Sequence, residues 1–218
     1  QKVKNKKIDE IYKYYKKNDI LDGLDQVKFV KNIPYSRTDL ILKYIKKYLK
    51  NKKNLLDIGT GTGVFLKSCD KYTNLKLSAF DLNDTYKNNI LDIKQVENFY
   101  SGDILNIESF FDAISLIHVL EHIESPIKFL NFLKSRLNKN GILIVQVPDI
   151  VNNNNDILIY DHLSHFTKET VFLLLSQVFK SVFFIDTGIN GKLTIIASDL
   201  LDINNSYPKS PSINNFNY

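Results

Sequence analysis

Short apolar runs alternate with helical repeats through the middle of the chain. The apolar, β-rich runs lie at 54–58, 76–80, 97–100, 112–117 and 142–147. The helical patterns between and after them include 63–70, 86–93 and 126–137. This alternation predicts an α/β fold in which a parallel sheet is covered by helices on both faces.

Two further helical repeats precede the first apolar run, over 7–18 and 38–49. The apolar side chains of the first repeat are Ile8, Ile11, Tyr12 and Tyr15, and those of the second are Leu40, Ile41, Tyr44, Ile45 and Tyr48. The segment between the repeats contains Gly23 and Pro34, which predicts a loop. Ser36 and Thr38 are candidate caps for the second helix.

The pattern changes after Pro148. A polar break at 152–155 is followed by 156–166, which carries aromatic residues and two histidines without clear periodicity, and which we interpret as an active-site loop. A helix at 167–178, capped by Thr167, comes next. Strands near 181–187 and 192–197 flank the turn 188–191, and a turn this short requires an antiparallel hairpin.

Composition indicates a soluble, cytoplasmic protein. No apolar run approaches the roughly 18 residues needed to cross a bilayer, and the lysine-rich N-terminal segment lacks the apolar core of a signal peptide. Cys69 is the only cysteine, which excludes an internal disulfide and favours a small buried side chain over a nucleophile. Abundant Lys, Asn, Ile and Tyr indicate an AT-rich, bacterial genome.

The net charge of +5 conceals a gradient along the chain. Residues 1–53 carry 16 Lys/Arg against 6 Asp/Glu, whereas the remainder carries 13 against 18. Such a basic flank could attract a nucleic acid, a phosphorylated substrate or an acidic partner. A solvated helix face in a lysine-rich protein is the simpler explanation.

The segment Leu55–Leu66, L-L-D-I-G-T-G-T-G-V-F-L, runs from a strand through three glycines into a helix. Glycines permit positive φ and let backbone N–H groups approach a ligand at a helix N-terminus. The dinucleotide pattern would require glycine at Val64, and a phosphate loop would require Gly-Lys-Ser/Thr shortly afterwards, so both are excluded. The D-x-G-x-G-x-G pattern from Asp57 to Gly63 resembles that of the class I S-adenosylmethionine-dependent methyltransferases, in which the loop cradles the methionine part of the cofactor.

The resemblance implies a Rossmann-like, mostly parallel seven-stranded sheet of order 3-2-1-4-5-7-6 that ends in an antiparallel hairpin. We expect an N-terminal helical lid or flank at 1–35, a methyltransferase domain at 36–198 and a loosely ordered tail at 199–218. The residues expected to bind S-adenosylmethionine are Arg37, Asp57, Gly59, Thr60, Gly61, Gly63, Asp81, Leu82, Asp103, Ile104, Ile117 and His118.

Three of these residues have alternatives that the sequence leaves open. Asp81 ends an apolar run 18 residues beyond Gly63, where a carboxylate can accept both ribose hydroxyls or simply cap a helix. Asp103 follows the third predicted strand, where the resemblance implies a contact with the adenine amino group, but it could be a turn-former. Arg37, one of two arginines, could bind the methionine carboxylate or an anionic acceptor, or form a surface ion pair.

The segment Phe111–Ile123, F-D-A-I-S-L-I-H-V-L-E-H-I, resembles the family's fourth motif. It lacks the Asn/Asp-Pro-Pro-aromatic motif of nucleobase amino-methyltransferases and the cysteine of cytosine C5 enzymes, which counts against nucleobase substrates but leaves ribose methylation open. It also spells H-x-x-E-H, from His118 to His122, which on a helix could chelate a metal. We expect no metal, because His118 should end a strand. The similar E-x-x-E/D-H motif of ubiquinone-pathway O-methyltransferases, which can hold a divalent cation, keeps that alternative open.

The segment Tyr160–Thr167 resembles the H-L-x-H/Y-F-T/S segment of small-molecule and sugar methyltransferases, which packs over the acceptor pocket. His162, His165 and His118 are the catalytic candidates. A neutral imidazole of the loop could take the proton from an acceptor hydroxyl, oriented by Asp161 or Tyr160. Alternatively, the loop histidines only close the loop by hydrogen bonding.

These features together predict an O-methyltransferase. Its expected acceptor is a small, sugar-like or anionic molecule, such as a sugar, a nucleotide-sugar or a phosphorylated precursor of a bacterial surface glycan, which would place the protein in capsule or polysaccharide biosynthesis. An RNA methyltransferase that clamps its substrate with the basic N-terminal region is the alternative enzyme, although two helices without interleaved stacking aromatics are a poor clamp. A non-catalytic cofactor-binding subunit is the alternative without catalysis.

Overall fold

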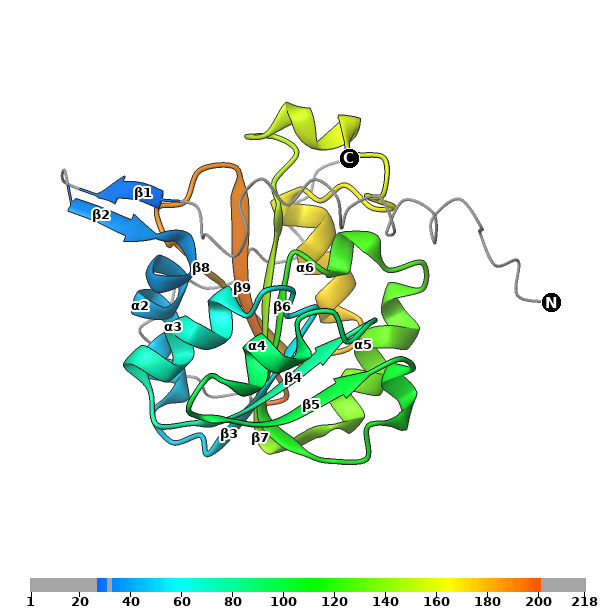
Figure 1. Ribbon diagram of the computed structural model, residues 1–218. Coiled ribbons are helices and arrows are strands. Elements are labelled where there is room, and N and C mark those ends of the chain that lie inside the picture. The colour runs from blue at the N-terminus through cyan, green and yellow to red at the C-terminus, as the bar shows by residue number, and fades with distance from the viewer. Residues whose placement is uncertain (1–26, 31–32, 201–218) are drawn as a thin grey trace.

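Seven strands form one twisted sheet in the computed structural model, which describes residues 27–30 and 33–200 (Figure 1). The strands are β3 (Asn54–Ile58), β4 (Lys76–Asp81), β5 (Val96–Ser101), β6 (Phe111–Ile117), β7 (Leu137–Pro148), β8 (Ser181–Ile185) and β9 (Lys192–Ser198). Their order across the sheet is β5-β4-β3-β6-β7-β9-β8, and only β9 runs antiparallel to its neighbours. Numbered from the first strand of this sheet, the order is 3-2-1-4-5-7-6, which confirms the predicted fold.

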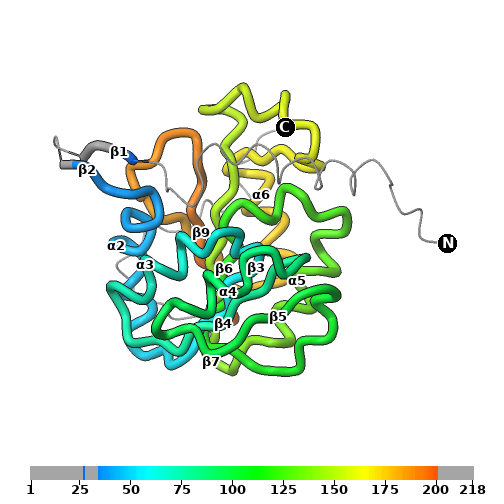
Figure 2. Tube along the Cα trace, in the orientation of Figure 1, coloured from blue at the N-terminus to red at the C-terminus, as the bar shows by residue number. Residues whose placement is uncertain are grey.

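The helices divide between the two faces of the sheet (Figures 1 and 2). The α-helices are α2 (Arg37–Leu49), α3 (Val64–Tyr72), α4 (Lys87–Leu91), α5 (Pro126–Ser135) and α6 (Lys168–Ser176). Three short 3₁₀ turns, η1 (Ile104–Asn106), η2 (Leu120–His122) and η3 (Asn154–Leu158), lie in the connections. Buried residues of α2, α3 and α4 belong to one core, and those of α5 and α6 to the other.

Alternation along each strand builds these two cores. Leu55 of β3 packs with α2 and α3, whereas its neighbour Leu56 packs with α5 and α6. Successive strand residues point to opposite faces, so a central strand covered on both sides needs a continuous apolar run. Cys69 of α3 is fully buried in the first core, where burial raises the pKa of its thiol well above the usual value. This confirms its expected structural role.

The helix caps also follow the sequence. Ser36 accepts a hydrogen bond from the Asp39 N–H at 3.1 Å and begins α2. Thr167 and Thr170 bond reciprocally in a capping box that begins α6. Helix α3 instead begins at Gly63, whose φ of +79° is a left-handed conformation. The cofactor-type loop therefore enters its helix without a side-chain cap.

The structure differs from the expected elements at two places. A small antiparallel hairpin, β1 (Val27–Val30) with β2 (Ile33–Ser36), replaces part of the predicted loop. Each strand has only four residues, which is too short for a periodicity to be read. Strand β7 begins at Leu137 rather than at 142, because α5 ends at Ser135. The predicted helix at 7–18 and most of the predicted tail lie outside the described residues.

The segment between β7 and α6 rises above the carboxyl end of the sheet (Figure 2). It contains η3 and the two histidines of the predicted active-site loop. No helix among the described residues is both long and apolar enough to span a bilayer.

Candidate functional site

A cavity of about 1070 Å³ opens at the carboxyl ends of β3, β4 and β6. Ligands of open parallel sheets bind in this position, beyond the carboxyl ends of the strands. The predicted site residues that line it are Gly59, Asp81, Leu82, Asp103, Ile104, His118 and His162. The other lining residues are Ile58, Phe80, Gly102, Val119, His122, Ile123, Phe129, Ile159 and Asp161.

The remaining predicted site residues lie outside the cavity lining. They are Arg37, Asp57, Thr60, Gly61, Gly63, Ile117 and His165. Arg37 opens α2, and its charge contributes to lowering the pKa of His118, so it lies close to the cavity. Cofactor contacts from these residues stay predictions.

The glycine loop packs closely against the chain after β6 at Gly59. Its φ is +68°, and a Cβ atom added there would lie 2.5 Å from Cγ2 of Val119. The N–H of Gly59 donates to the carbonyl of Phe80 at 2.8 Å, which ties the loop to β4. The missing side chain thus allows both the turn and the contact with the chain after β6.

Asp81 is held rigidly at the end of β4. Its Oδ2 accepts a hydrogen bond from the Gly61 N–H at 2.8 Å, and its Oδ1 accepts one from the Leu82 N–H at 2.7 Å. Each carboxylate oxygen can accept a further bond, because a carboxylate has about four acceptor sites. The carboxylate is therefore positioned for hydroxyl donors on the cavity side.

Asp103 follows β5, the strand that pairs with β4, and also lines the cavity. Its side chain accepts a hydrogen bond from the Leu105 N–H at 3.0 Å and caps η1. The turn-forming role considered from the sequence is therefore present. The adenine contact stays a prediction, since Asp103 also lines the cavity.

Asp57 lies beneath the loop rather than in the cavity. It is almost fully buried, and the Ser115 hydroxyl of the neighbouring strand β6 donates to its Oδ1 at 2.6 Å. Burial raises the pKa of Asp57 to about 7; hydrogen bonds from Ser115 and Thr60 oppose this, and the charge of Asp81 adds to it. Asp57 therefore supports the glycine loop from the buried side.

His118 has an unusual backbone conformation. Its φ of +59° is the only positive φ outside glycine among the described residues. Strand β6 ends at Ile117, one residue before the expected end, and η2 begins at Leu120, so His118 directly follows the strand and does not share a helix with His122. Non-glycine residues in this conformation cost about 1–3 kcal/mol and are frequent at functional sites.

The surroundings of His118 disfavour the charged form of its imidazole. Burial lowers its pKa, the hydrogen bond and charge of Glu121 oppose this effect, and the charges of Arg37 and Lys192 add to it. Nδ1 lies 3.0 Å from Oε1 of Glu121. Nε2 is buried without a hydrogen-bond partner in the described part of the chain, which leaves it available to a ligand in the cavity.

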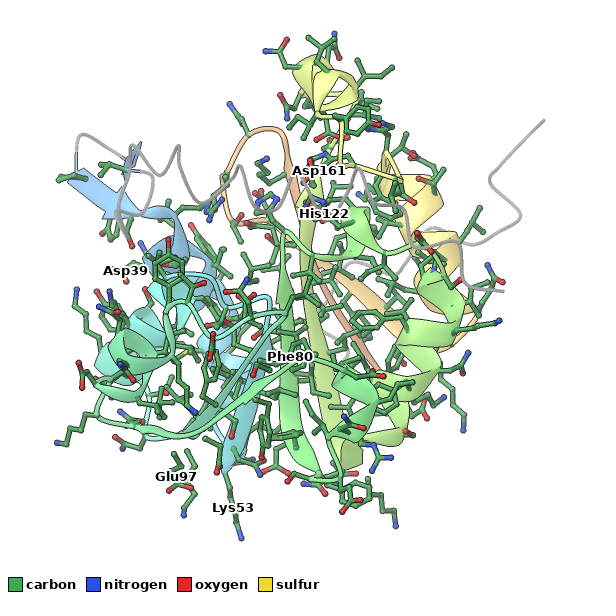
Figure 3. All side chains as sticks on the ribbon, turned by 45° about the vertical axis from the view of Figure 1, so that its right-hand side comes forward. Asp39, Lys53, Phe80, Glu97, His122 and Asp161 are labelled. Atoms are coloured by element: carbon green, nitrogen blue, oxygen red, sulfur yellow. The ribbon has the colours of Figure 1, made fainter. Side chains whose placement is uncertain are left out.

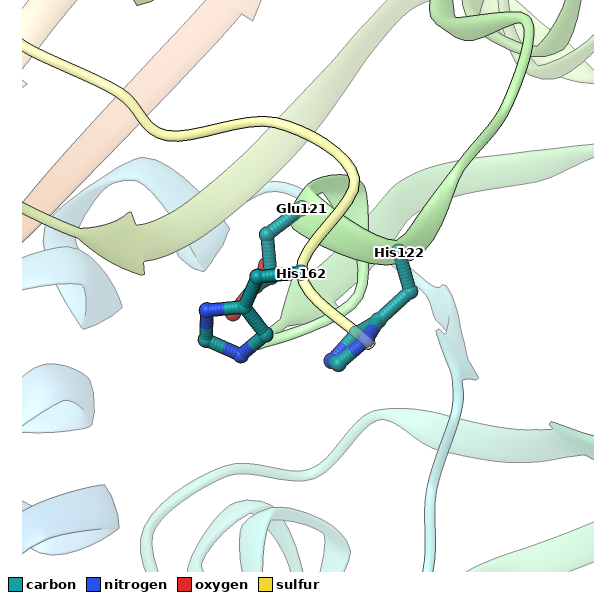
Figure 4. A group of neighbouring side chains, drawn as sticks. All are labelled: Glu121, His122 and His162. Carbon is teal, nitrogen blue, oxygen red and sulfur yellow. The ribbon is translucent and has the colours of Figure 1, made fainter. Parts of the chain in front are cut away.

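Glu121, His122 and His162 form the first side-chain group that could hold a metal ion (Figure 4). One potential ligand atom from each lies within 4.8 Å of the others. Glu121 is fully buried, and its Oε2 has no hydrogen-bond partner among the described residues. A carboxylate with two imidazoles suits first-row transition metals. The second histidine of this group is therefore His162 of the loop, and not His118 of the H-x-x-E-H motif.

Partners on the main chain hold this group together. The carbonyl of Asp161 lies 2.9 Å from Nδ1 of His122, and these two residues adjoin above the sheet (Figure 3). The carbonyl of Glu121 accepts hydrogen bonds from the N–H groups of Leu163 and Ser164, at 2.8 and 3.1 Å. The histidine loop is therefore fastened to the turn that follows β6.

A second group, Asp156, His162 and His165, lies in the same loop. Sequence reasoning missed Asp156, because it stands in an asparagine-rich stretch with no local motif. His162 Nδ1 lies 2.8 Å from Oδ1 of Asp156, and His165 Nδ1 lies 3.0 Å from its Oδ2. The expected orienting residues are placed differently: Tyr160 is 69% exposed, and Asp161 faces His122.

Comparison with known proteins agrees with this geometry. Residues 29–177 match a family described as a methyltransferase domain. The chain is 28% identical over 138 residues to the ribosomal protein L11 methyltransferase of Macrococcus caseolyticus, a match that covers 59% of this chain and 42% of the relative. It is 23% identical over 112 residues to the mitochondrial ubiquinone biosynthesis O-methyltransferase of Dictyostelium discoideum, with coverages of 42% and 34%. The chain thus spans less than half the length of these curated relatives.

Among solved structures, human N-acetylserotonin methyltransferase in complex with S-adenosylmethionine is similar with a TM-score of 0.62. The identity is 19%, and the match covers 74% of this chain and 51% of that chain, so it shows the fold alone. The family match covers well over half of the chain and includes the glycine loop, Asp81, Asp103 and the histidine loop. The chain belongs to the S-adenosylmethionine-dependent methyltransferases.

Proposed function

We propose that this methyltransferase transfers the methyl group to a hydroxyl oxygen of a small polar acceptor. The observation that carries the proposal is the position of His162. Its ring lines the same cavity as Gly59 and Asp81, and the loop that bears it is hydrogen-bonded to Glu121. A candidate proton acceptor and the predicted cofactor residues therefore line one cavity.

The residues of the chain would divide the work between binding and proton transfer. The backbone of the glycine loop and the carboxylates of Asp81 and Asp103 would hold S-adenosylmethionine. When bound, this cofactor supplies an electrophilic methyl group on a sulfonium. His162 would accept the acceptor's hydroxyl proton at a ring nitrogen, and the apolar wall of Val119, Phe129 and Ile159 would exclude water.

Positioning is the larger of the two contributions. Alignment of two reactants can lower a barrier by about 7–11 kcal/mol, whereas a general base contributes roughly 10²–10⁴-fold in rate. The short hydrogen bonds that fix the glycine loop and Asp81 provide a rigid frame for alignment. Loss of His162 should accordingly slow turnover without abolishing it.

The size of the cavity supports a small acceptor. Pockets for drug-sized ligands measure about 300–1000 Å³. A cavity of about 1070 Å³ that must also hold the cofactor leaves room for a compact acceptor. The likeness of 160–167 to the loop of sugar methyltransferases, and the cationic side chains of Arg37 and Lys192 near His118, support a sugar, nucleotide-sugar or phosphorylated precursor of a surface glycan. The curated O-methyltransferase relative supports oxygen as the methylated atom.

The test is release of S-adenosylhomocysteine from the purified chain. Nucleotide-activated sugars, phosphorylated metabolites and total RNA would be supplied in separate panels with S-adenosylmethionine. Release with a small hydroxylated acceptor, and its reduction in His162→Ala, would support the proposal. Release with RNA alone would reassign the enzyme to RNA. Cofactor binding without release in any panel would count against an O-methyltransferase of these acceptor classes.

A further inference from the structure

Asp156 lies between two histidines of the loop that follows β7. Its carboxylate is buried, with one oxygen facing each ring. The contact from His165 has hydrogen-bond geometry at 3.0 Å. His162 Nδ1 is closer to its oxygen, at 2.8 Å, but the angle is not that of a hydrogen bond. One side of the carboxylate is thus anchored, while the other lies within reach of the proposed base.

We propose that Asp156 is the positioning residue of His162. A carboxylate can only accept hydrogen bonds, so it selects the tautomer of His162 that carries its proton on Nδ1. Nε2 is then left as the acceptor. The proposal deepens the O-methyltransferase function given above and rests on it for the role of His162, but the placement of the proton can be measured independently.

Because the Asp156 carboxylate is buried, hydrogen bonds to both imidazole rings would stabilise it. A buried charged group is costly unless it is hydrogen-bonded, and the carboxylate oxygens of Asp156 lie 2.8 Å and 3.0 Å from Nδ1 of His162 and His165. Catalytic hydrogen bonds are often poorly aligned before substrate binds and tighten in the complex. A small turn of the His162 ring would align a contact that is already short enough.

The backbone of the loop builds this arrangement. The N–H of Asp156 donates to the carbonyl of Asn153, that of Ile159 to Asp156, and that of His162 to Ile159, at 3.0, 3.1 and 3.2 Å. Each contact spans three residues. The resulting succession of turns brings residues 156 and 162 face to face, while Leu158 between them is 79% exposed.

The neighbouring carboxylate has a different task, which makes it a matched control. Oδ2 of Asp161 lies 3.4 Å from Nδ1 of His122, and the carbonyl of the same residue lies 2.9 Å from that atom. Asp156 therefore lies beside His162 and His165, whereas Asp161 lies beside His122. The two acids are five residues apart and both buried, so their variants test position rather than charge.

Nitrogen-15 NMR of the histidine rings tests the proposal. The chain has only four histidines, so single His→Gln variants assign every signal. In the wild-type protein at pH 8 we expect His162 to be protonated on Nδ1. In Asp156→Asn the ring signals of His162 and His165 should shift and those of His118 should not, whereas in Asp161→Asn the shift should fall on His122. Protonation of wild-type His162 on Nε2 would overturn the proposal, even if Asp156→Asn fails to fold.

Kinetics provide the second measurement. Asp156→Asn should lower kcat about 10–100-fold, less than the loss of the base itself, and leave KM for S-adenosylmethionine unchanged. An unchanged kcat together with a shifted His162 signal would overturn the positioning role. If no acceptor is turned over by the wild-type protein, the proposed function fails, while the ring spectra still decide where the His162 proton lies.

Discussion

Ser115 donates a hydrogen bond of 2.6 Å to the buried carboxyl group of Asp57, across the two central strands of the sheet. Burial raises the pKa of Asp57 from 3.8 to about 7, so the folded protein holds this proton more tightly than the unfolded chain does. The contribution of Asp57 to the free energy of folding is fully present below about pH 4. It is lost as the pH rises toward 7.

The Asp57→Asn variant should therefore lack the loss of folding stability that the wild-type protein shows as the pH rises. Between pH 5 and pH 8 we expect the wild-type protein to lose roughly 2–3 kcal/mol of folding free energy relative to this variant. Urea unfolding of both proteins at the two pH values measures the difference. A difference that does not change with pH would show that Asp57 titrates normally in the folded state.

Asp81→Ala should weaken cofactor binding. The carboxylate both fixes Gly61 and faces the cavity, and hydrogen bonds to a charged group are worth about 1.5–3 kcal/mol each. We expect the Kd for S-adenosylmethionine to rise at least tenfold in calorimetry. Asp84→Ala, which removes an exposed carboxylate three residues further on, is the control and should bind normally. Equal affinities of the two variants for S-adenosylmethionine would show that Asp81 does not bind the cofactor.

His162→Ala should separate binding from rate. Its ring lines the cavity, and in the part of the chain that the structure describes it forms no hydrogen bond with the glycine loop. The Kd for S-adenosylmethionine should stay unchanged while kcat falls about 10²–10⁴-fold. Calorimetry and single-turnover rates with the identified acceptor measure both. Full activity in this variant would exclude His162 as the base.

Gly59→Ala should destabilise the loop more than Gly61→Ala. Both glycines have positive φ, which costs alanine about 1–2 kcal/mol, but only the Cβ at position 59 would clash, at 2.5 Å from Val119 Cγ2. Overpacking typically adds about 1–3 kcal/mol. Thermal unfolding should rank wild type above Gly61→Ala and Gly61→Ala above Gly59→Ala.

The double variant Gly59→Ala/Val119→Ala identifies the cause of that ranking. Removal of the Val119 methyl groups relieves the clash but not the backbone strain. The double variant should therefore recover part of the lost stability relative to Gly59→Ala. A purely additive loss would mean that the contact with Val119 does not limit position 59.

Chelation should leave the rate unchanged. A cation held by Glu121, His122 and His162 would compete for the ring that the proposed base requires. After dialysis against EDTA we expect full activity, and added Zn²⁺ should inhibit by occupying this group. Activity that disappears on chelation and returns with Mn²⁺ or Zn²⁺ would instead make His162 a metal ligand, and Glu121→Gln would then abolish the restoration.

The fold and the glycine loop could be predicted from the sequence. Both depend on local regularities: a continuous apolar run for each covered strand, helical spacing between them, Ser36 and Thr167 at helix starts, and glycines where φ is positive. Each of these features depends on residues that are close together in the sequence, so it can be recognised without knowledge of the tertiary structure.

Which histidine lies beside which acid could be read only from the folded chain. Asp156 comes from an asparagine-rich stretch, Glu121 from the turn after β6 and His162 from a loop without periodicity, and no spacing relates them. The fold also separates His118 from His122, because His118 adopts a left-handed conformation directly after β6, and it places Asp161 beside His122 instead of His162. Contacts of this kind depend on how loops pack at the end of the sheet, a long-range property that one-dimensional patterns do not record.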